Sequence, residues 1–380
     1  MIATQLKIAN RKEVFHYMRA KYLRTGEDTS KAEIAKHTGI SNPTLMKITD
    51  FFMRKGLLEA GGEVVLSVGR PSQMLRVKRD CMYAVGFLME GIYLYMGVVD
   101  IFGSIIYRKV LEVERDILAV GRQIRDRMVP ELLAEAGIPA EKLVGIGIAV
   151  PASYDVNTRM ISYGRMVKIK TETYVGDYLD EMESLYHVPV FFENDANAEC
   201  LGANNSRNLL TGGGDMLLFS LGTGIGAALI LDGKLRRGFH ERCGEIWCNV
   251  LNSREAPGPD NTLENRISLL KVFEKYGMEY RDGAKGMPPM IREQIVEDIA
   301  KELAVAIHNA NTLIDCKNLV VCGQVIELLG DPFLETVNRH LEEMLPQGKH
   351  PRLEVESPFV GIAGIAGRCI EYQVARILEG

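Results

Sequence analysis

Four polar residues fall on one face of a predicted helix and have the chemistry needed to contact DNA. They are Ser41, Asn42, Thr44 and Lys47. Amide and hydroxyl groups exchange hydrogen bonds with base edges and phosphates, and a lysine neutralises a phosphate charge. This face therefore predicts a surface that enters the major groove.

The elements that carry this face are three helical patterns between residues 10 and 56, the first of them predicted to be capped by Asn10. Ser30 and Glu33 have the spacing of a capping box at the start of the second helix, which is expected to end near Gly39. Ser41 is a plausible N-cap of the third helix. Its buried stripe, at spacing i, i+3 and i+7, consists of Leu45, Ile48 and Phe52. Two helices joined by a short glycine-containing turn are typical of a helix-turn-helix.

Two short strands are predicted to follow as a wing, with Gly61–Gly62 as their hairpin turn. Arg70 lies on the return path of this wing. An arginine on a stiff backbone suits a narrow minor groove, where the negative potential is enhanced. The alternative is a three-helix interaction domain that does not contact DNA.

The charge distribution favours DNA. Residues 1–80 contain 15 Lys and Arg against 8 Asp and Glu, a balance of +7, whereas the other 300 residues contain 30 against 42, a balance of −12. A basic head on an acidic body is expected when one end of a chain meets a polyanion. The chain has no long apolar run of the kind that forms a signal peptide or membrane span, and its seven cysteines show no paired spacing. We expect a cytoplasmic protein with reduced thiols.

The body after residue 80 repeats one pattern. Three apolar strands separated by glycine-containing turns occupy residues 83–107, and a similar set occupies residues 215–238. Helical patterns fill residues 118–136, 174–186, 262–276 and 291–315. Strands that alternate with helices around an internal repeat predict an α/β fold of two similar lobes with a ligand cleft between them.

Several motifs in a fixed order make the resemblance specific. Gly69-Arg70-Pro71 follows the helix-turn-helix, and the body contains ENDANAE at 193–199, LGTGIG at 221–226, GE at 244–245 and LE at 263–264. Over residues 10–380 the chain resembles the ROK family of repressors, uncharacterised reading frames and sugar kinases. The resemblance implies a winged helix-turn-helix joined to a two-lobed actin-like ATPase domain with duplicated glycine-rich β-hairpins.

The resemblance also shows where the kinase machinery has changed. The first glycine turn of the family's kinases matches Gly86–Ile92, where Leu88 replaces an aspartate, Glu90 a glycine and Ile92 a threonine. A glutamate at this turn would repel a phosphate, and a leucine cannot organise a magnesium shell. The second turn, Gly222–Gly226, is intact, whereas Cys322-Gly323-Gln324 replaces a glycine-rich run that faces adenosine in the family. We therefore predict no kinase activity and no cofactor.

The sugar contacts implied by the resemblance are largely retained. They are Asn194, Asp195, Glu245 and Glu264. Asp195 matches the family's catalytic base and can still accept a hydrogen bond from a sugar hydroxyl. Asn194 and Asp195 could equally cap the helix that follows them, and both roles can hold together.

The metal chemistry implied by the resemblance is not retained. Cys248 stands in place of a histidine that touches the sugar and zinc, and Trp247 in place of a glycine, where it either stacks on the sugar or fills space. The family's zinc cysteines fall at Glu255, Pro257 and Thr262, so we predict no zinc. Cys200, Cys243 and Cys248 are expected to be ordinary buried thiols.

These observations predict a sugar-responsive repressor that binds operator DNA as a homodimer or homotetramer and is not an enzyme. The alternatives are an active ATP-dependent sugar kinase with a DNA-binding head, and a ligand-free dimeric scaffold for a protein partner. We expect a DNA-binding domain at residues 1–79, a first lobe at 80–200 and a second lobe at 201–380, with the C-terminal helix packed on the first lobe. The sequence discloses neither the sugar, the operator nor the sign of the response.

Overall fold

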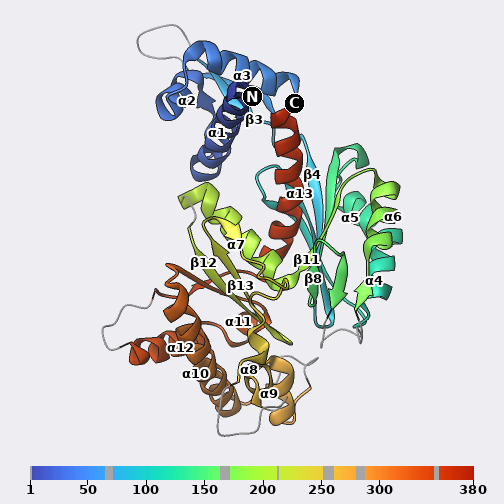
Figure 1. Cartoon of the computed structure of the whole chain (residues 1–380), viewed down its shortest axis with the longest axis vertical. Coiled ribbons are helices and arrows are strands. Elements are labelled where there is room, and N and C mark those ends of the chain that lie inside the picture. The colour runs from blue at the N-terminus through green and yellow to red at the C-terminus, as the bar shows by residue number, and fades with distance from the viewer. Residues whose placement is uncertain are drawn as a thin grey trace.

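The computed structural model describes residues 2–64, 72–162, 172–211, 214–250, 261–279, 287–345 and 351–380. The chain forms a helical head and two α/β lobes, and one long C-terminal helix runs between the lobes and the head (Figure 1). Among the described residues, no helix is long and apolar enough to cross a lipid bilayer.

The head combines three helices with a small antiparallel sheet. Its elements are α1 (Ile2–Thr25), β1 (Thr29–Ser30), α2 (Lys31–Thr38), α3 (Asn42–Arg54), β2 (Leu58–Val64) and β3 (Ser72–Val77), with the strands in the order β1-β3-β2. The predicted stripe of Leu45, Ile48 and Phe52 is buried. The Ser30 hydroxyl accepts a hydrogen bond from the Glu33 amide at 3.2 Å, which confirms the predicted cap of α2. Gly39 ends this helix in the left-handed region, at φ 68°.

Two details of the predicted head are wrong. Helix α1 begins at Ile2, and Asn10 lies inside it, because the residues before Asn10 contain no helix breaker and several good helix formers. Gly61 and Gly62 lie within β2, at a register shift between Ala60 and Glu63, so they form a bulge and not the hairpin turn. The connection from β2 to β3 falls at residues 65–71, outside the described residues, and so does Arg70.

The two lobes contain sheets of the same strand order. The first sheet, in the order β11-β7-β4-β5-β6, consists of β4 (Tyr83–Glu90), β5 (Tyr93–Asp100), β6 (Ile105–Glu112), β7 (Leu143–Val150) and β11 (Val190–Asn194). The second, in the order β16-β15-β12-β13-β14, consists of β12 (Met216–Leu221), β13 (Ile225–Leu231), β14 (Lys234–Leu235), β15 (Asn318–Cys322) and β16 (Glu354–Val355). In both sheets three antiparallel strands are followed by two parallel ones. The predicted duplication is therefore confirmed.

Helices cover these sheets. The first lobe has α4 (Ile117–Gln123), a π-helical turn (Ile124–Met128), α5 (Val129–Glu135), a short 3-10 turn (Ala140–Lys142) and α6 (Gly176–Tyr186), with a small sheet of β8 (Ser153–Asp155), β9 (Met160–Ser162) and β10 (Thr173–Tyr174). The second lobe has a 3-10 turn (Ile246–Cys248), α8 (Leu263–Ile267), α9 (Leu269–Lys275), α10 (Pro289–Ile314), α11 (Gln324–Leu329) and α12 (Asp331–Met344). Four predicted helical regions thus coincide with α4–α5, α6, α8–α9 and α10.

Two helices cross at the centre of the molecule, α7 (Asp195–Thr211) and α13 (Val360–Glu379) (Figure 1). Helix α13 packs on the first sheet at glycines, since a Cβ on Gly145 would lie 2.5 Å from the Cβ of Cys369 and one on Gly147 would lie 2.7 Å from Ile365. At the crossing, a side chain on Gly364 would collide with the carbonyl oxygen of Ala198. These glycines set the position of α13 against both the sheet and α7.

Candidate effector cleft and DNA-binding surface

The four predicted sugar contacts lie in one cleft. Asn194, Asp195, Glu245 and Glu264 line one hollow together with the second glycine turn, Gly222–Gly226. Asn194 and Asp195 come from the junction of β11 and α7, Glu245 from the segment after β14, and Glu264 from α8. Residues far apart in sequence thus present amide and carboxylate groups to the same space.

Asn194 and Asp195 are held by the start of α7. The Asn194 side-chain oxygen accepts a hydrogen bond from the Asn197 amide at 3.1 Å, and its amide nitrogen donates to Asp195 at 3.0 Å and to the Ala152 carbonyl at 3.4 Å. The Asp195 carboxylate accepts the Ala196 amide at 2.8 Å. The capping role that the sequence offers is confirmed for Asn194, and it leaves both side chains on the wall of the cleft.

Glu245 is fixed from both lobes. The Ser153 hydroxyl, on β8, donates to one oxygen at 2.6 Å, and the Trp247 indole nitrogen donates to the other. The sequence predicted that Trp247 either stacks on a sugar or fills space. Neither alternative included its hydrogen bond to Glu245. Ser153 was not predicted either, because the contact spans 92 residues of sequence. The one available sequence signal for Ser153 was that its hydroxyl follows the end of a strand.

Glu90 lies where the two glycine turns face one another. Its side chain is buried and reaches over Gly222, and the Gln324 amide donates to one oxygen at 3.5 Å. The second oxygen has no hydrogen-bond partner among the described residues. The neighbouring Gly91 packs against Thr223 of the second turn. A carboxyl group thus occupies the space between turns that would have to admit a phosphate.

Three carboxyl groups interact along this wall. Burial, then the charges of Glu199 and Asp195, raise the pKa of Glu90 well above its usual range. Burial, then the charges of Glu199 and Glu245, raise the pKa of Asp195 well above its usual range. Burial raises the pKa of Glu199 to about 7, although hydrogen bonds from Ser220 and Cys322 oppose the shift. Protonation of this group of acids is therefore coupled.

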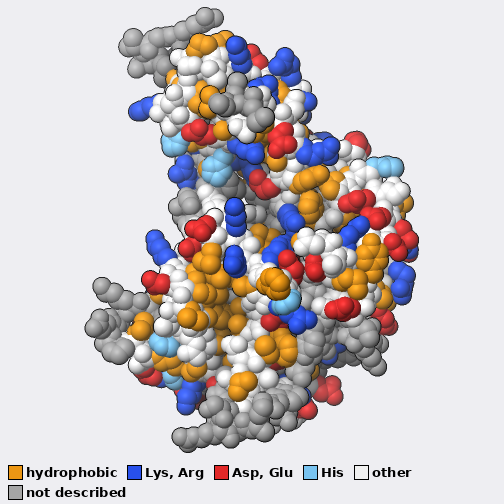
Figure 2. Space-filling view, in the orientation of Figure 1, with side chains coloured by type: hydrophobic (Ala, Val, Ile, Leu, Met, Phe, Trp, Pro, Cys, Tyr) orange, Lys and Arg blue, Asp and Glu red, His pale blue; other side chains and the backbone are white. Residues whose placement is uncertain are grey.

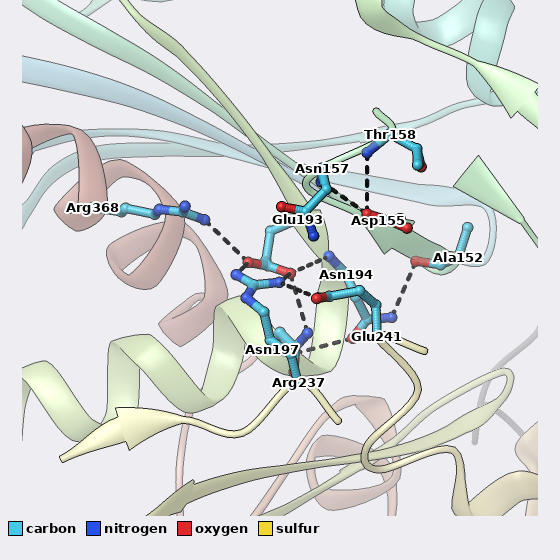
Figure 3. Close-up of polar contacts among 10 residues, drawn as sticks. All are labelled: Ala152, Asp155, Asn157, Thr158, Glu193, Asn194, Asn197, Arg237, Glu241 and Arg368. Atoms are coloured by element: carbon cyan, nitrogen blue, oxygen red, sulfur yellow. Dashed lines mark hydrogen bonds and ion pairs between the residues drawn. The ribbon is translucent and has the colours of Figure 1, made fainter. Parts of the chain in front are cut away.

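A second polar group lies directly behind the cleft, around Glu193 (Figure 3). The Glu193 side chain is fully buried and is paired with Arg237 and Arg368. It also accepts hydrogen bonds from the Asn194 amide and the Asn197 side chain, each at 3.1 Å. Glu193 belongs to the ENDANAE motif, but the sequence did not indicate its partners, which lie 44 and 175 residues away.

The residues that correspond to the family's metal ligands do not form a metal site among the described residues. No three His, Cys, Asp or Glu side chains in this part of the chain converge as metal ligands. Thr262 is described and buried, whereas Glu255 and Pro257 lie outside the described residues. Cys200 is buried and Cys243 half-buried, but Cys248 is exposed because it lies in a surface 3-10 turn, which corrects the expectation of a buried thiol.

The predicted recognition face is on the surface of the head. Ser41, Asn42 and Lys47 are exposed and Thr44 is half-buried, at the start of α3. The hydroxyls of Ser41 and Thr44 are hydrogen-bonded at 3.0 Å, in place of a bond from Ser41 to the helix backbone. Figure 2 shows Lys and Arg side chains scattered over the visible face of the head and a hollow between the head and the second lobe.

Comparison with known proteins agrees with this architecture. Residues 94–259 match the ROK family. This segment of the chain is therefore similar to the ROK family. It is 25% identical over 363 residues to a putative xylose repressor of Caldicellulosiruptor sp. (strain Rt8B.4), covering 86% of this chain and 87% of that protein. It is 25% identical over 265 residues to the xylose repressor of Bacillus subtilis (strain 168), covering 67% of this chain and 64% of that protein.

Solved structures share the fold of this chain. A ROK family transcriptional regulator, a homologue of the E. coli MLC protein, superposes with a TM-score of 0.71 at 16% identity, covering 98% of this chain and all of that one. A ROK family glucokinase from Streptomyces griseus, in complex with glucose and AMPPNP, gives a TM-score of 0.60 at 20% identity, covering 75% of this chain and 98% of that one. The likeness to the glucokinase shows that the two lobes have the actin-like ATPase fold.

Proposed function

We propose that the chain is a sugar-responsive transcriptional repressor of carbohydrate-metabolism genes. The observation that carries the proposal is the combination of an exposed polar face on α3 with a cleft that gathers Asn194, Asp195, Glu245 and Glu264. The likeness to proteins named xylose repressor supports it. Such a repressor would act in the cytoplasm, where its operator is.

The DNA-binding residues we propose are Ser41, Asn42, Thr44 and Lys47 on α3, with Arg70 on the wing. A homodimer or homotetramer would place two such helices in successive major grooves of a palindromic operator. We propose a division into a DNA-binding domain at 1–79, a first lobe at 80–200 and a second lobe at 201–380. The packing of α13 on the first sheet supports assigning that helix to the first lobe in space.

We also propose that the cleft binds its sugar without phosphorylating it. The buried carboxyl group of Glu90 fills the space between the glycine turns, and Leu88 offers no ligand for magnesium. A phosphate there would meet the Glu90 side chain, and no Lys or Arg among the described lining residues would compensate the phosphate charge. The alternative of an active sugar kinase rests on the intact turn at Gly222–Gly226.

The lining also favours a sugar without a phosphate group. Apart from the Cys243 thiol, the titratable side chains among the described residues that line the cleft are all carboxyl groups: Glu90, Asp195, Glu241, Glu245 and Glu264. Carboxyl groups exchange hydrogen bonds with hydroxyl groups, but a lining without Lys or Arg offers an anionic phosphate no charge compensation. We therefore propose a neutral sugar as the effector.

The test measures sugar binding and DNA binding on the same full-length protein. Thermal unfolding is followed with a panel of neutral pentoses and hexoses, their phosphates, and ATP with magnesium in a separate arm. We expect one or a few neutral sugars to raise the melting temperature, since a ligand that binds only the folded state stabilises it, and Asp195→Ala to abolish the rise. The same sugar should change the affinity for operator DNA selected from a random library.

Each alternative has its own outcome in this test. Stabilisation by ATP with magnesium, together with ATP consumption that Asp195→Asn removes, would establish the kinase. Stabilisation by no sugar at millimolar concentration would favour the scaffold for a protein partner. Selection of no DNA sequence by the wild-type chain would refute the assignment of the head.

A further inference from the structure

The strongest unassigned feature is the buried ion cluster of Glu193, Arg237 and Arg368 (Figure 3). Glu193 ends β11, immediately before Asn194 and Asp195 in the cleft. Its side chain has no exposed surface, and two arginines share its carboxylate. A buried carboxylate needs a cationic partner, and Glu193 has two, so it is held from two directions at once.

The two arginines come from different parts of the molecule. Arg237 belongs to the second lobe, in the segment after β14, and a second hydrogen bond of 3.4 Å joins it to Glu241, which lines the cleft. Arg368 belongs to α13, contacts Glu193 at 3.1 Å and lies over the ring of Phe191 at 4.8 Å from its centroid. Both lobes and α13 therefore meet at one carboxylate directly behind the cleft.

Helix α13 continues from this cluster to the head (Figure 1). Ten residues separate Arg368 from Leu378, which is about 15 Å of helix. One turn beyond Arg368, Glu371 pairs with Arg19 of α1 at 2.6 Å, and at the end of the helix the Leu378 carbonyl accepts a hydrogen bond from Arg11 of α1 at 2.7 Å. Arg11 and Arg19 are both buried, so these contacts fix α1 against α13.

The last contact reaches the recognition helix. The Arg11 guanidinium group lies over the ring of Phe51, 3.5 Å from its centroid. Phe51 is buried on α3, the helix that carries Ser41, Asn42 and Lys47 near its start. One guanidinium group thus joins the end of α13 to the helix proposed to enter the major groove.

We propose that the Glu193 cluster and α13 couple the sugar cleft to the DNA-binding head, with Arg368 as the positioning residue at the cleft end. The inference rests on the proposed function. A sugar that binds Asn194 and Asp195 and draws the second lobe towards them shifts Glu193 and Arg237 together. Arg368 transmits this shift to α13, which moves α1 and α3 as one body because Arg11 and Arg19 fix them to it.

The energy for this change comes from the sugar's different affinity for the two arrangements, not from the ion cluster itself. Glycine packing limits what α13 can do, because Gly364 and Gly147 hold it in contact with α7 and the first sheet. A close-packed helix moves as a unit and does not bend locally. The cluster should therefore affect coupling more than it affects either binding reaction.

The experiment measures three quantities for each variant: sugar affinity without DNA, operator affinity without sugar, and operator affinity at saturating sugar. The ratio of the two operator affinities is the coupling, which is typically about 5- to 150-fold in allosteric proteins. For Arg368→Gln we expect this ratio to approach one, while sugar affinity and sugar-free operator affinity stay within about threefold of wild type. Arg368→Lys keeps the charge and should restore part of the ratio.

Arg339→Gln is the matched control. Arg339 lies on α12 of the second lobe and forms ion pairs with Glu297 and Glu343, none of which belongs to the proposed connection, so the coupling ratio should be retained. If Arg368→Gln does not fold, Glu371→Gln breaks the contact between α13 and Arg19, one turn further along the helix, and should lower the ratio. A wild-type ratio in a folded Arg368→Gln or Glu371→Gln protein overturns the inference. Absence of any sugar effect in the wild type instead overturns the proposed function.

Discussion

Substitution of Glu199 by glutamine should change how the stability of the protein depends on pH. Glu199 lies on α7, its side chain is buried, and the Cys322 thiol donates to it at 3.2 Å. Burial raises its pKa to about 7, against an ordinary value of 4.5. Between these values the carboxyl group is protonated in the folded protein and ionised in the unfolded chain.

The sign and size of the pH effect on stability follow from the difference between these two pKa values. Because the folded state binds more protons, its stability falls as pH rises from about 4.5, and the loss is complete above about pH 7. At about 1.4 kcal/mol per pH unit, the loss amounts to about 3 kcal/mol. Glutamine has nearly the same shape and cannot ionise, so Glu199→Gln should be more stable than wild type at pH 8 by an amount approaching this figure.

Urea unfolding at pH 5, 6, 7 and 8 measures the effect. The advantage of Glu199→Gln should grow over this range, and Glu335→Gln, which removes an exposed carboxylate on α12, gives the baseline. Part of the growth will come from Glu90 and Asp195, since loss of the Glu199 charge eases their ionisation. Parallel stability profiles for wild type and Glu199→Gln would refute the reasoning, because they would mean that Glu199 ionises alike in both states.

Three further outcomes are expected. Glu90→Gly should open the space between the glycine turns, so that ATP with magnesium raises the melting temperature of the variant but not of the wild type; no rise in either protein would show that Glu90 is not the sole obstacle. Gly364→Ala should cost about 1–3 kcal/mol by forcing α13 away from the Ala198 carbonyl, as measured by thermal unfolding, and an unchanged melting temperature would contradict the close contact. Arg70→Ala should weaken operator binding and flatten the preference for A·T flanks in gel-shift assays, and if both stay unchanged the wing assignment is wrong.

The fold was largely predictable because its signals are local. Apolar runs with glycine-containing turns predicted both sets of three strands, and the repeat predicted two lobes. The errors occurred where local signals compete. Asn10 favours a cap, but good helix formers and the absence of a helix breaker before it extend the helix to Ile2. Gly61–Gly62 has turn chemistry, yet two adjacent glycines also suit a bulge.

The cleft was predictable only in part. The motifs placed Asn194, Asp195, Glu245 and Glu264 in one site, because a motif records residues that share a task. Contacts that form only where the two lobes meet have no corresponding motif in the sequence. Ser153 reaches Glu245 and Arg368 reaches Glu193 across long stretches of chain, and periodicity carries no information about such pairs.

The position of α13 has a consequence for how the molecule is made. The helix covers the glycine face of the first sheet, yet it is synthesised after the entire second lobe. While residues 195–359 leave the ribosome, the apolar positions that α13 will bury, such as Ala84 and Val99, lack their partner. Contacts so distant in sequence form late and slowly. The first lobe therefore matures last, and chaperone dependence should decrease when α13 is supplied earlier by circular permutation.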